Sequence, residues 1–213
     1  MLSHNTSLSR RRFLKTANNI PTNKQPSVAA VNDTIDPYEG EWTFATANHL
    51  LRRTTFGANF KDIQKVVDAG LEATINNLFK IDPISAEPIN YYLPTDSVAI
   101  GESWVNKELD RTIDELRISR ERSFISWSNN QIYTSSLTIL EKLSLFWQNH
   151  FALESVFDSR ATYDYHEIIR THALGNFKQL IKDITIDPAM LLFLNGASNN
   201  VFSPNENFSR ELL

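Results

Sequence analysis

Apolar residues recur every three or four positions along most of the chain from Tyr38 onward, and this is the period of an amphipathic α-helix. No stretch shows the two-residue alternation that is typical of a half-buried strand. Phe44, Ala47 and Leu51 form the first apolar face, and Gly57 is placed to end that helix. The pattern predicts an all-α protein, built as an irregular bundle of several helices.

Three prolines and a pair of tyrosines interrupt the pattern between residues 81 and 94, which predicts an irregular surface segment. Neither glycine nor proline occurs between Gly101 and Gly175. Within that stretch, apolar residues at helical spacing predict one long helix from about Glu102 to Gln131. At about 1.5 Å per residue it would measure roughly 45 Å.

The segment "SSLTILEKLSLFWQNHFALE" has the broadest apolar face and predicts the most deeply buried helix. His150 follows Leu143 by seven residues and Phe146 by four, so its imidazole is predicted to face inward. His172 has the same relation to the apolar residues of the next helix, whereas His166 is predicted to be half exposed. A buried imidazole needs a partner, although a histidine in a last helical turn is also explained by the helix dipole.

The segment "SPNENFSREL" opens with Ser203, predicted to cap a helix with Glu206 as its capping-box partner. Glu206 and Arg210 have the spacing of an ion pair on one helix face. Capping and pairing leave three further polar residues unexplained: Asn205, Asn207 and Glu211. Their density predicts a hydrogen-bonded cluster, either a specificity network in the core or the wall of a site.

Six residues are therefore candidates for catalysis: His150, His172, Asn205, Glu206, Arg210 and Glu211. In such a site one histidine would act as general base and Arg210 would position an anionic group. The chain has no glycine-rich phosphate loop and no G-x-S-x-G elbow, and no cofactor is assigned. "HEIIRTH" places two histidines six residues apart where a zinc helix needs four, so no metal site is predicted.

Composition excludes several classes of protein. The absence of cysteine rules out disulfides, thiolate metal clusters and a cysteine nucleophile. Residues 1–31 carry five basic and no acidic side chains, and the rest of the chain carries 16 basic against 25 acidic side chains. An acidic body argues against a nucleic-acid partner, and no apolar run reaches the roughly 18 residues of a membrane span.

The amino-terminal stretch "SRRRFLK" is similar to the twin-arginine export signature. The sequence that follows it is polar and contains two prolines, so it lacks the apolar run of a working signal. Residues 1–37 are predicted to form a basic disordered tail, and residues 38–213 the helical domain. A degenerate export signal remains the alternative, and the compartment stays open.

Four motifs occur in order at compatible spacing: "HLLRRTTFG", "LFWQNHF", "RTHALGNFKQLIKDITIDPAMLLFLNG" and "PNENFSREL". Over about Trp42 to Leu213 they resemble the bacterial DUF1800 family. The resemblance implies a helical protein of unknown activity, often exported and often encoded beside a DUF1501 protein, which is thus a possible partner. In that family the helix begun by "PNENFSREL" continues, so the resemblance predicts that the chain is incomplete at its carboxyl end.

Two functions are consistent with these observations. The favoured hypothesis is a non-catalytic module that is associated with the cell envelope or binds a partner. The alternative is a hydrolase-type enzyme whose His/Glu/Arg site needs the missing carboxy-terminal half.

Overall fold

The structure is a computed structural model of the chain and describes residues 36–81, 83–84, 86–154 and 156–211. The chain divides into two units, Met1–Gly40 and Glu41–Leu213. Only residues 36–40 of the first unit are described, so the twin-arginine-like motif and nearly all of the predicted tail lie outside the described residues. Within residues 36–40, the ring of Tyr38 lies so close to Gly40 that a Cβ there would have no space.

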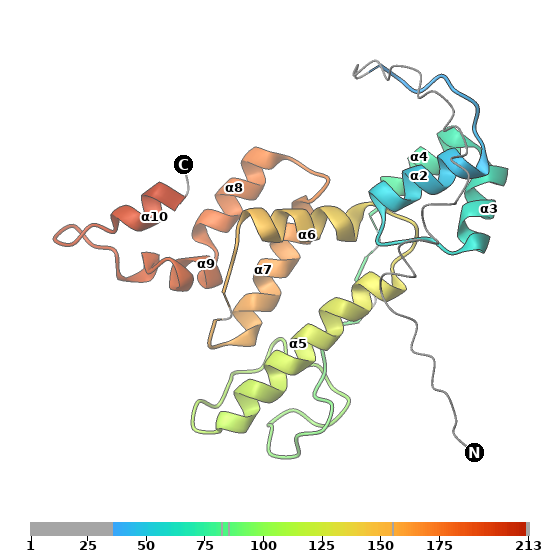
Figure 1. The fold of residues 1–213 in the computed structure, drawn as a ribbon. Helices are drawn as coiled ribbons and strands as arrows, with labels where there is room; N and C mark the ends of the chain where they lie inside the picture. The colour runs from blue at the N-terminus through green and yellow to red at the C-terminus, as the bar shows by residue number, and fades with distance from the viewer. Residues whose placement is uncertain (1–35, 82, 85, 155, 212–213) are drawn as a thin grey trace, which may run out of the picture. The chain divides into compact units, whose positions relative to one another are not determined.

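The all-α prediction is confirmed. The described residues contain nine α-helices and one 3₁₀ turn, and their only β-type pairings are two isolated bridges (Figure 1). A search of these residues for a helix long and apolar enough to span a bilayer finds none.

The first three helices of the second unit are α2 (Phe44–Thr54), α3 (Phe60–Ala69) and α4 (Leu71–Leu78). Thr43 and Asn59 open α2 and α3 with reciprocal capping boxes, which satisfy the free amides of the first turns. The three helices share a core of buried residues: Ala47, Leu51, Ile63, Val66 and Leu78.

The predicted long helix is wrong in its first part. Instead of Glu102–Gln131, the helix α5 spans Asp114–Thr134, and the described residues between α4 and α5 are irregular. Just before α5, a carboxylate oxygen of Asp110 accepts hydrogen bonds from the amide and the hydroxyl of Thr112, at 2.9 and 2.6 Å. This local turn competes with helical hydrogen bonding and delays the start of the helix.

Two side chains organise the irregular segment. The buried amide of Asn90 donates to the carbonyls of Leu93 and Val98, at 2.8 and 2.9 Å, and so closes the loop on itself. Trp104 is fully buried and its indole N–H donates to the hydroxyl of Ser123 on α5, at 2.9 Å. The backbone around Trp104 therefore serves to insert this ring against α5 rather than to extend the helix.

The second half of the fold contains α6 (Leu140–His150), α7 (Ser159–His172), α8 (Phe177–Ile186) and α9 (Pro188–Phe193). Helix α7 is central, because it contacts α5, α6, α8 and α9 (Figure 1). The buried core of this half comprises Tyr165, Ile169, Leu180, Ile184, Ala189 and Met190.

Local hydrogen bonds of capping residues position α8 and α9. Asn176 accepts a hydrogen bond from the amide of Gln179 at 3.1 Å. Asp187 accepts one from the amide of Met190 at 2.9 Å and is followed by Pro188 at the first helical position.

The last described helix is α10 (Glu206–Glu211), which follows the 3₁₀ turn η1 (Gly196–Ser198) and a tight turn. Its cap differs from the prediction. Asn205, rather than Ser203, accepts the hydrogen bond from a first-turn amide, that of Phe208, at 3.2 Å. Ser203 instead pairs its backbone with Asn200 across the turn.

Candidate functional site

His150 ends α6 on the surface among aromatic rings. Its imidazole stacks on Phe146 with centroids 6.4 Å apart and an interplanar angle of 5°, and it meets Phe151 edge-on at 4.7 Å. The prediction that His150 faces inward is wrong. The buried residues of α6 are Leu140, Glu141 and Ser144. Two of these are polar but hydrogen-bonded, and a pattern that counts only apolar residues misses such a face.

His172 is half buried and lies at the end of α7. Its Nε2 atom is 2.8 Å from Oδ2 of Asp183 on α8, and the other oxygen of Asp183 accepts a hydrogen bond from Gln179. This pairing joins the last turn of α7 to α8. The imidazole of His172 therefore has a partner on the neighbouring helix and lines none of the pockets described below.

His166 is fully buried, so the prediction that it is half exposed is wrong. Its Nδ1 atom lies 2.8 Å from the amide nitrogen of Gln148, and its ring packs edge-on against Trp127 at 5.2 Å. Burial, with a smaller contribution from the positive charge of Arg170, lowers the pKa of His166 to about 4. The ring is neutral at physiological pH.

The polar residues of α10 divide between structure and surface. Asn205 caps the helix and donates its amide to the carbonyl of Leu194, at 2.7 Å. Arg210 donates to the side-chain oxygen of Asn207 at 2.6 Å, so the predicted pairing of Arg210 with Glu206 is not the one formed. Glu206 is exposed.

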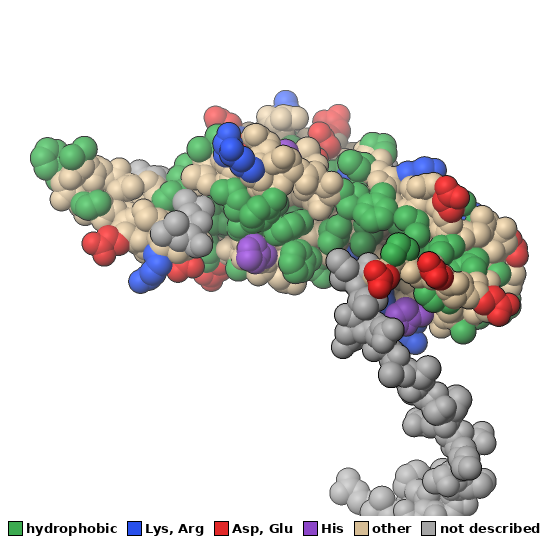
Figure 2. Space-filling model, turned by 90° about the horizontal axis from the view of Figure 1, so that it is seen from above, with side chains coloured by type: hydrophobic (Ala, Val, Ile, Leu, Met, Phe, Trp, Pro, Cys, Tyr) green, Lys and Arg blue, Asp and Glu red, His purple; other side chains and the backbone are tan. Residues whose placement is uncertain are grey.

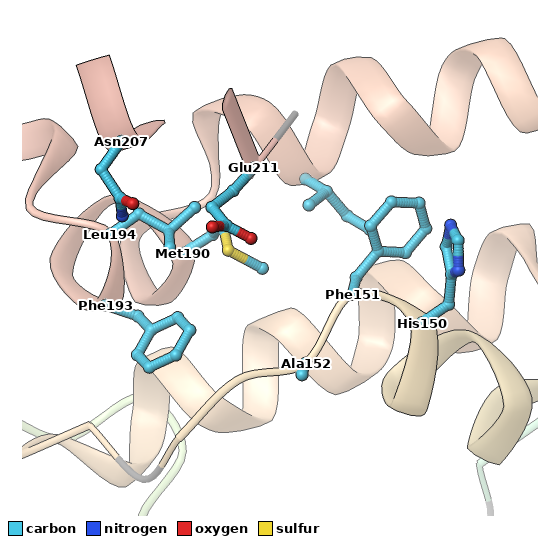
Figure 3. A pocket seen from close by; sticks show the side chains of 9 residues that line it. His150, Phe151, Ala152, Met190, Phe193, Leu194, Asn207 and Glu211 are labelled. Atoms are coloured by element: carbon cyan, nitrogen blue, oxygen red, sulfur yellow. The ribbon is translucent and has the colours of Figure 1, made fainter. Parts of the chain in front are cut away.

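A pocket of about 390 Å³ lies where α6, α8, α9 and α10 come together (Figure 3). It is lined by His150, Phe151, Ala152, Ile184, Met190, Phe193, Leu194, Asn207 and Glu211. Two of the six candidate catalytic residues, His150 and Glu211, therefore reach one cavity. Figure 3 places the carboxylate of Glu211 beside Met190 and the imidazole of His150 at the other end, with the ring of Phe151 between them.

An aromatic cluster adjoins this pocket, and we call it the aromatic platform: Phe146, Trp147, His150, Phe151 and Phe177. Trp147 is its centre, with Phe177 stacked on it at 5.3 Å and Phe146 edge-on at 5.0 Å. Phe146 and Phe177 are 54% and 51% exposed. The space-filling view shows hydrophobic side chains gathered over a broad area of one face (Figure 2).

The arrangement separates the imidazole of His150 from the carboxylate of Glu211 (Figure 3). A general base must be within hydrogen-bonding reach of the group from which it takes a proton, and a carboxylate that orients it must contact it. His150 contacts rings rather than a carboxylate. A search of the described residues also finds no group of three His, Asp or Glu side chains placed to hold a metal ion.

A set of buried charges lies on the inner faces of the helices and was not predicted from the sequence. Arg170 on α7 pairs with Glu141 on α6, and Arg120 on α5 pairs with Asp96. Arg170 follows the buried His166 by four residues, so both lie on one face of α7. Arg170 could have been identified from the sequence as a polar residue that continues a buried helix face at helical spacing.

The family model described as "Protein of unknown function (DUF1800)" matches residues 49–213. No curated protein and no solved structure matches this chain.

Proposed function

The chain belongs to the DUF1800 family, and we propose that it acts as a non-catalytic module that binds a partner protein through the aromatic platform and the adjoining pocket. The observation that carries the proposal is the exposure of Phe146 and Phe177 beside an apolar-walled cavity. Adjacent exposed aromatic side chains are typical of protein-binding surfaces.

The residues that line the pocket indicate which chemical groups of the partner would bind there. The side chains of Met190, Phe193 and Leu194 favour an apolar group, and the carboxylate of Glu211 favours a positive charge beside it. Fully burying a phenylalanine contributes about 1.5 to 3 kcal/mol, so covering the exposed halves of Phe146 and Phe177 would contribute about 2 kcal/mol. The expected partner segment carries an apolar side chain next to lysine or arginine.

The family resemblance suggests where to begin. Because relatives are often exported and encoded beside a DUF1501 protein, a DUF1501-like protein at the cell envelope is the first partner to test. Calorimetric titration of the purified chain with such a protein should detect binding. Replacing Phe177 by Ser should weaken it about tenfold, which corresponds to about 1.4 kcal/mol.

Tyr133 on α5 provides a matched control, because it is 86% exposed and lies outside the platform. The variant Tyr133→Ser should bind as the wild type does. Equal affinities for the Phe177 and Tyr133 variants would contradict the proposal that the aromatic platform binds the partner. If the wild type did not bind, a DUF1501-like protein would be excluded as the partner.

The hydrolase hypothesis has one supporting observation, that His150 and Glu211 line the same pocket. It requires the two groups to cooperate across the ring of Phe151, which separates them (Figure 3). If the enzyme hypothesis were correct, His150→Gln would abolish a hydrolytic activity of the chain.

A further inference from the structure

A second site lies on the other side of α6, where two opposite charges are buried together. The Nε atom of Arg170 donates to Oε1 of Glu141 at 2.8 Å, and the two side chains are 8% and 5% exposed. Moving both charges out of water is costly, and a single hydrogen bond offsets only part of that cost. This pair therefore calls for an explanation beyond the joining of α6 to α7.

The guanidinium of Arg170 has five N–H groups, and only the Nε group has a protein partner among the described residues. Arg170 and Glu141 both line a cavity of about 270 Å³ at the junction of α5 and α6. Arg170 lines the cavity, so its terminal nitrogens are available to a molecule bound there.

Six of the seven residues that line the cavity have polar side chains, and two of their hydroxyl groups have a defined hydrogen-bonding direction. The hydroxyls of Thr134 and Ser135 donate to the carbonyls of Asn130 and Ile132, at 2.7 and 3.1 Å, so they present lone pairs to the cavity. Gln131 is buried and its carboxamide can both donate and accept. Hydroxyl acceptors and the donors of Arg170 therefore line the same cavity.

We propose that this cavity binds a small zwitterion of the α-amino-acid type. The carboxylate of such a ligand would take two parallel hydrogen bonds from the terminal nitrogens of Arg170, the geometry that arginine favours. Its ammonium would lie near the second carboxylate oxygen of Glu141 and the hydroxyl oxygens of Thr134 and Ser135. A cavity of this size accommodates a small amino acid.

The charge balance selects against simpler ions. Arg170 and Glu141 carry opposite charges in one cavity, so a plain carboxylate could pair only with Arg170 and a plain amine only with Glu141. Glu167, on the same helix, adds negative potential around Arg170. Only a ligand that carries a negative and a positive charge can pair with Arg170 and with Glu141 at the same time.

The test is a ligand-observed NMR titration of the full chain with the twenty amino acids, and with acetate, ethylamine and glucose as probes of a single chemistry. We expect at least one amino acid to bind at concentrations up to about 10 mM, where a millimolar Kd corresponds to a weak but measurable complex. Acetate, ethylamine and glucose should not bind under the same conditions. Binding of acetate or ethylamine equal to that of the amino acid would overturn the proposal, as would failure of all twenty.

Variants locate the bound molecule. Because Arg170→Lys could perturb the fold, the primary variant is Thr134→Val, which removes an exposed hydroxyl and should weaken binding about tenfold. Thr171→Val makes the same substitution at an exposed position of α7 outside the cavity and should leave the affinity unchanged. Equal affinities for the two variants, with native circular dichroism, would place the bound molecule elsewhere and refute the site.

Discussion

Arg120 and Asp96 form a two-pronged ion pair in which each side chain is only 1% exposed. The Nε and one Nη of Arg120 donate to the two oxygens of Asp96, at 3.1 and 2.8 Å. The other Nη donates to the carbonyl of Lys107 at 2.7 Å. One guanidinium on α5 thus holds two separate points of the irregular segment, and the position of that segment depends on it.

Replacing Arg120 by Ala should therefore be among the most destabilising changes in the chain. It leaves the carboxylate of Asp96 buried without its cation, and breaking such a pair costs about 3 to 5 kcal/mol. Urea denaturation measures the loss in the free energy of unfolding. Arg117→Ala, which removes a partly exposed pair with Glu121, should cost under about 1 kcal/mol. Similar losses for both variants would contradict the role given to Arg120.

Acid should destabilise the fold through His166. Its folded pKa of about 4 lies below the ordinary value of 6.5, so the unfolded chain binds the proton more readily. The contribution of the neutral ring is fully present above pH 6.5 and is lost as the pH falls toward 4, by at most about 3 kcal/mol. Unfolding free energies measured between pH 7 and 4 should show this slope, and His166→Gln should flatten it.

The pH dependence of the wild type must be compared with that of His166→Gln, because Glu167 also changes its contribution to stability with pH. Burial raises the pKa of its carboxyl group, so its contribution changes with pH in the opposite direction. Both proteins carry Glu167, and the difference between their slopes isolates His166. A direct NMR titration of the imidazole with a midpoint near 6.5 would disprove the proposed burial effect.

The cap of α10 gives a third prediction. Asn205→Ala removes the acceptor for the amide of Phe208 and the donor to Leu194, and should destabilise α10 by about 1 to 2 kcal/mol. Ser203→Ala should be nearly neutral, because Ser203 uses its backbone in the turn. Hydrogen exchange at the Phe208 amide measures both effects, and faster exchange in the Ser203 variant alone would restore the cap predicted from sequence.

The sequence identified helical caps where the chain around them was regular. Asp187 before Pro188 and Ser203 before Pro204 look alike in the sequence, yet only the first is a cap. The difference is Asn200, whose side-chain oxygen accepts hydrogen bonds from the amides of Phe202 and Ser203, both at 3.0 Å. Because that turn already uses the backbone amide of Ser203, this residue does not cap the helix. The sequence pattern that indicates a cap does not take account of such a turn.

The predicted long helix was wrong because spacing does not distinguish a helix from a loop that packs on one. Leu109 and Ile113 continue the apolar stripe of α5 in the sequence. In the structure they belong to the irregular segment and pack in the same cluster as Leu116. Burial is thus correctly indicated, but the conformation that achieves it depends on tertiary contacts of Asn90 and Trp104.

The candidate site was only partly predictable for a related reason. The density of polar groups in "NENFSREL" drew attention to Glu211, which lines the pocket. Asn205 was marked for the same reason but caps a helix. The aromatic platform depends on Trp147 and Phe177 from two different helices, and no single-helix pattern brings them together.

Gly196 connects the turn before α10 to the pocket. A Cβ at this position would lie 2.9 Å from Cδ2 of Leu191 and 3.0 Å from Cδ2 of Phe208, closer than ordinary contacts allow. Gly196→Ala should displace Phe208 and with it the helix that carries Glu211. We expect a loss of about 1 to 3 kcal/mol in stability from overpacking, together with weaker partner binding.

Gly175 is the matched control for this substitution. A Cβ there would lie 3.5 Å from the backbone of His172, an ordinary contact, and its backbone is not among those with positive φ. Gly175→Ala should therefore fold with stability near that of the wild type and bind equally well. If Gly196→Ala bound its partner with unchanged affinity although α10 had shifted, Glu211 would not belong to the binding surface, and the partner would be held by the aromatic platform alone.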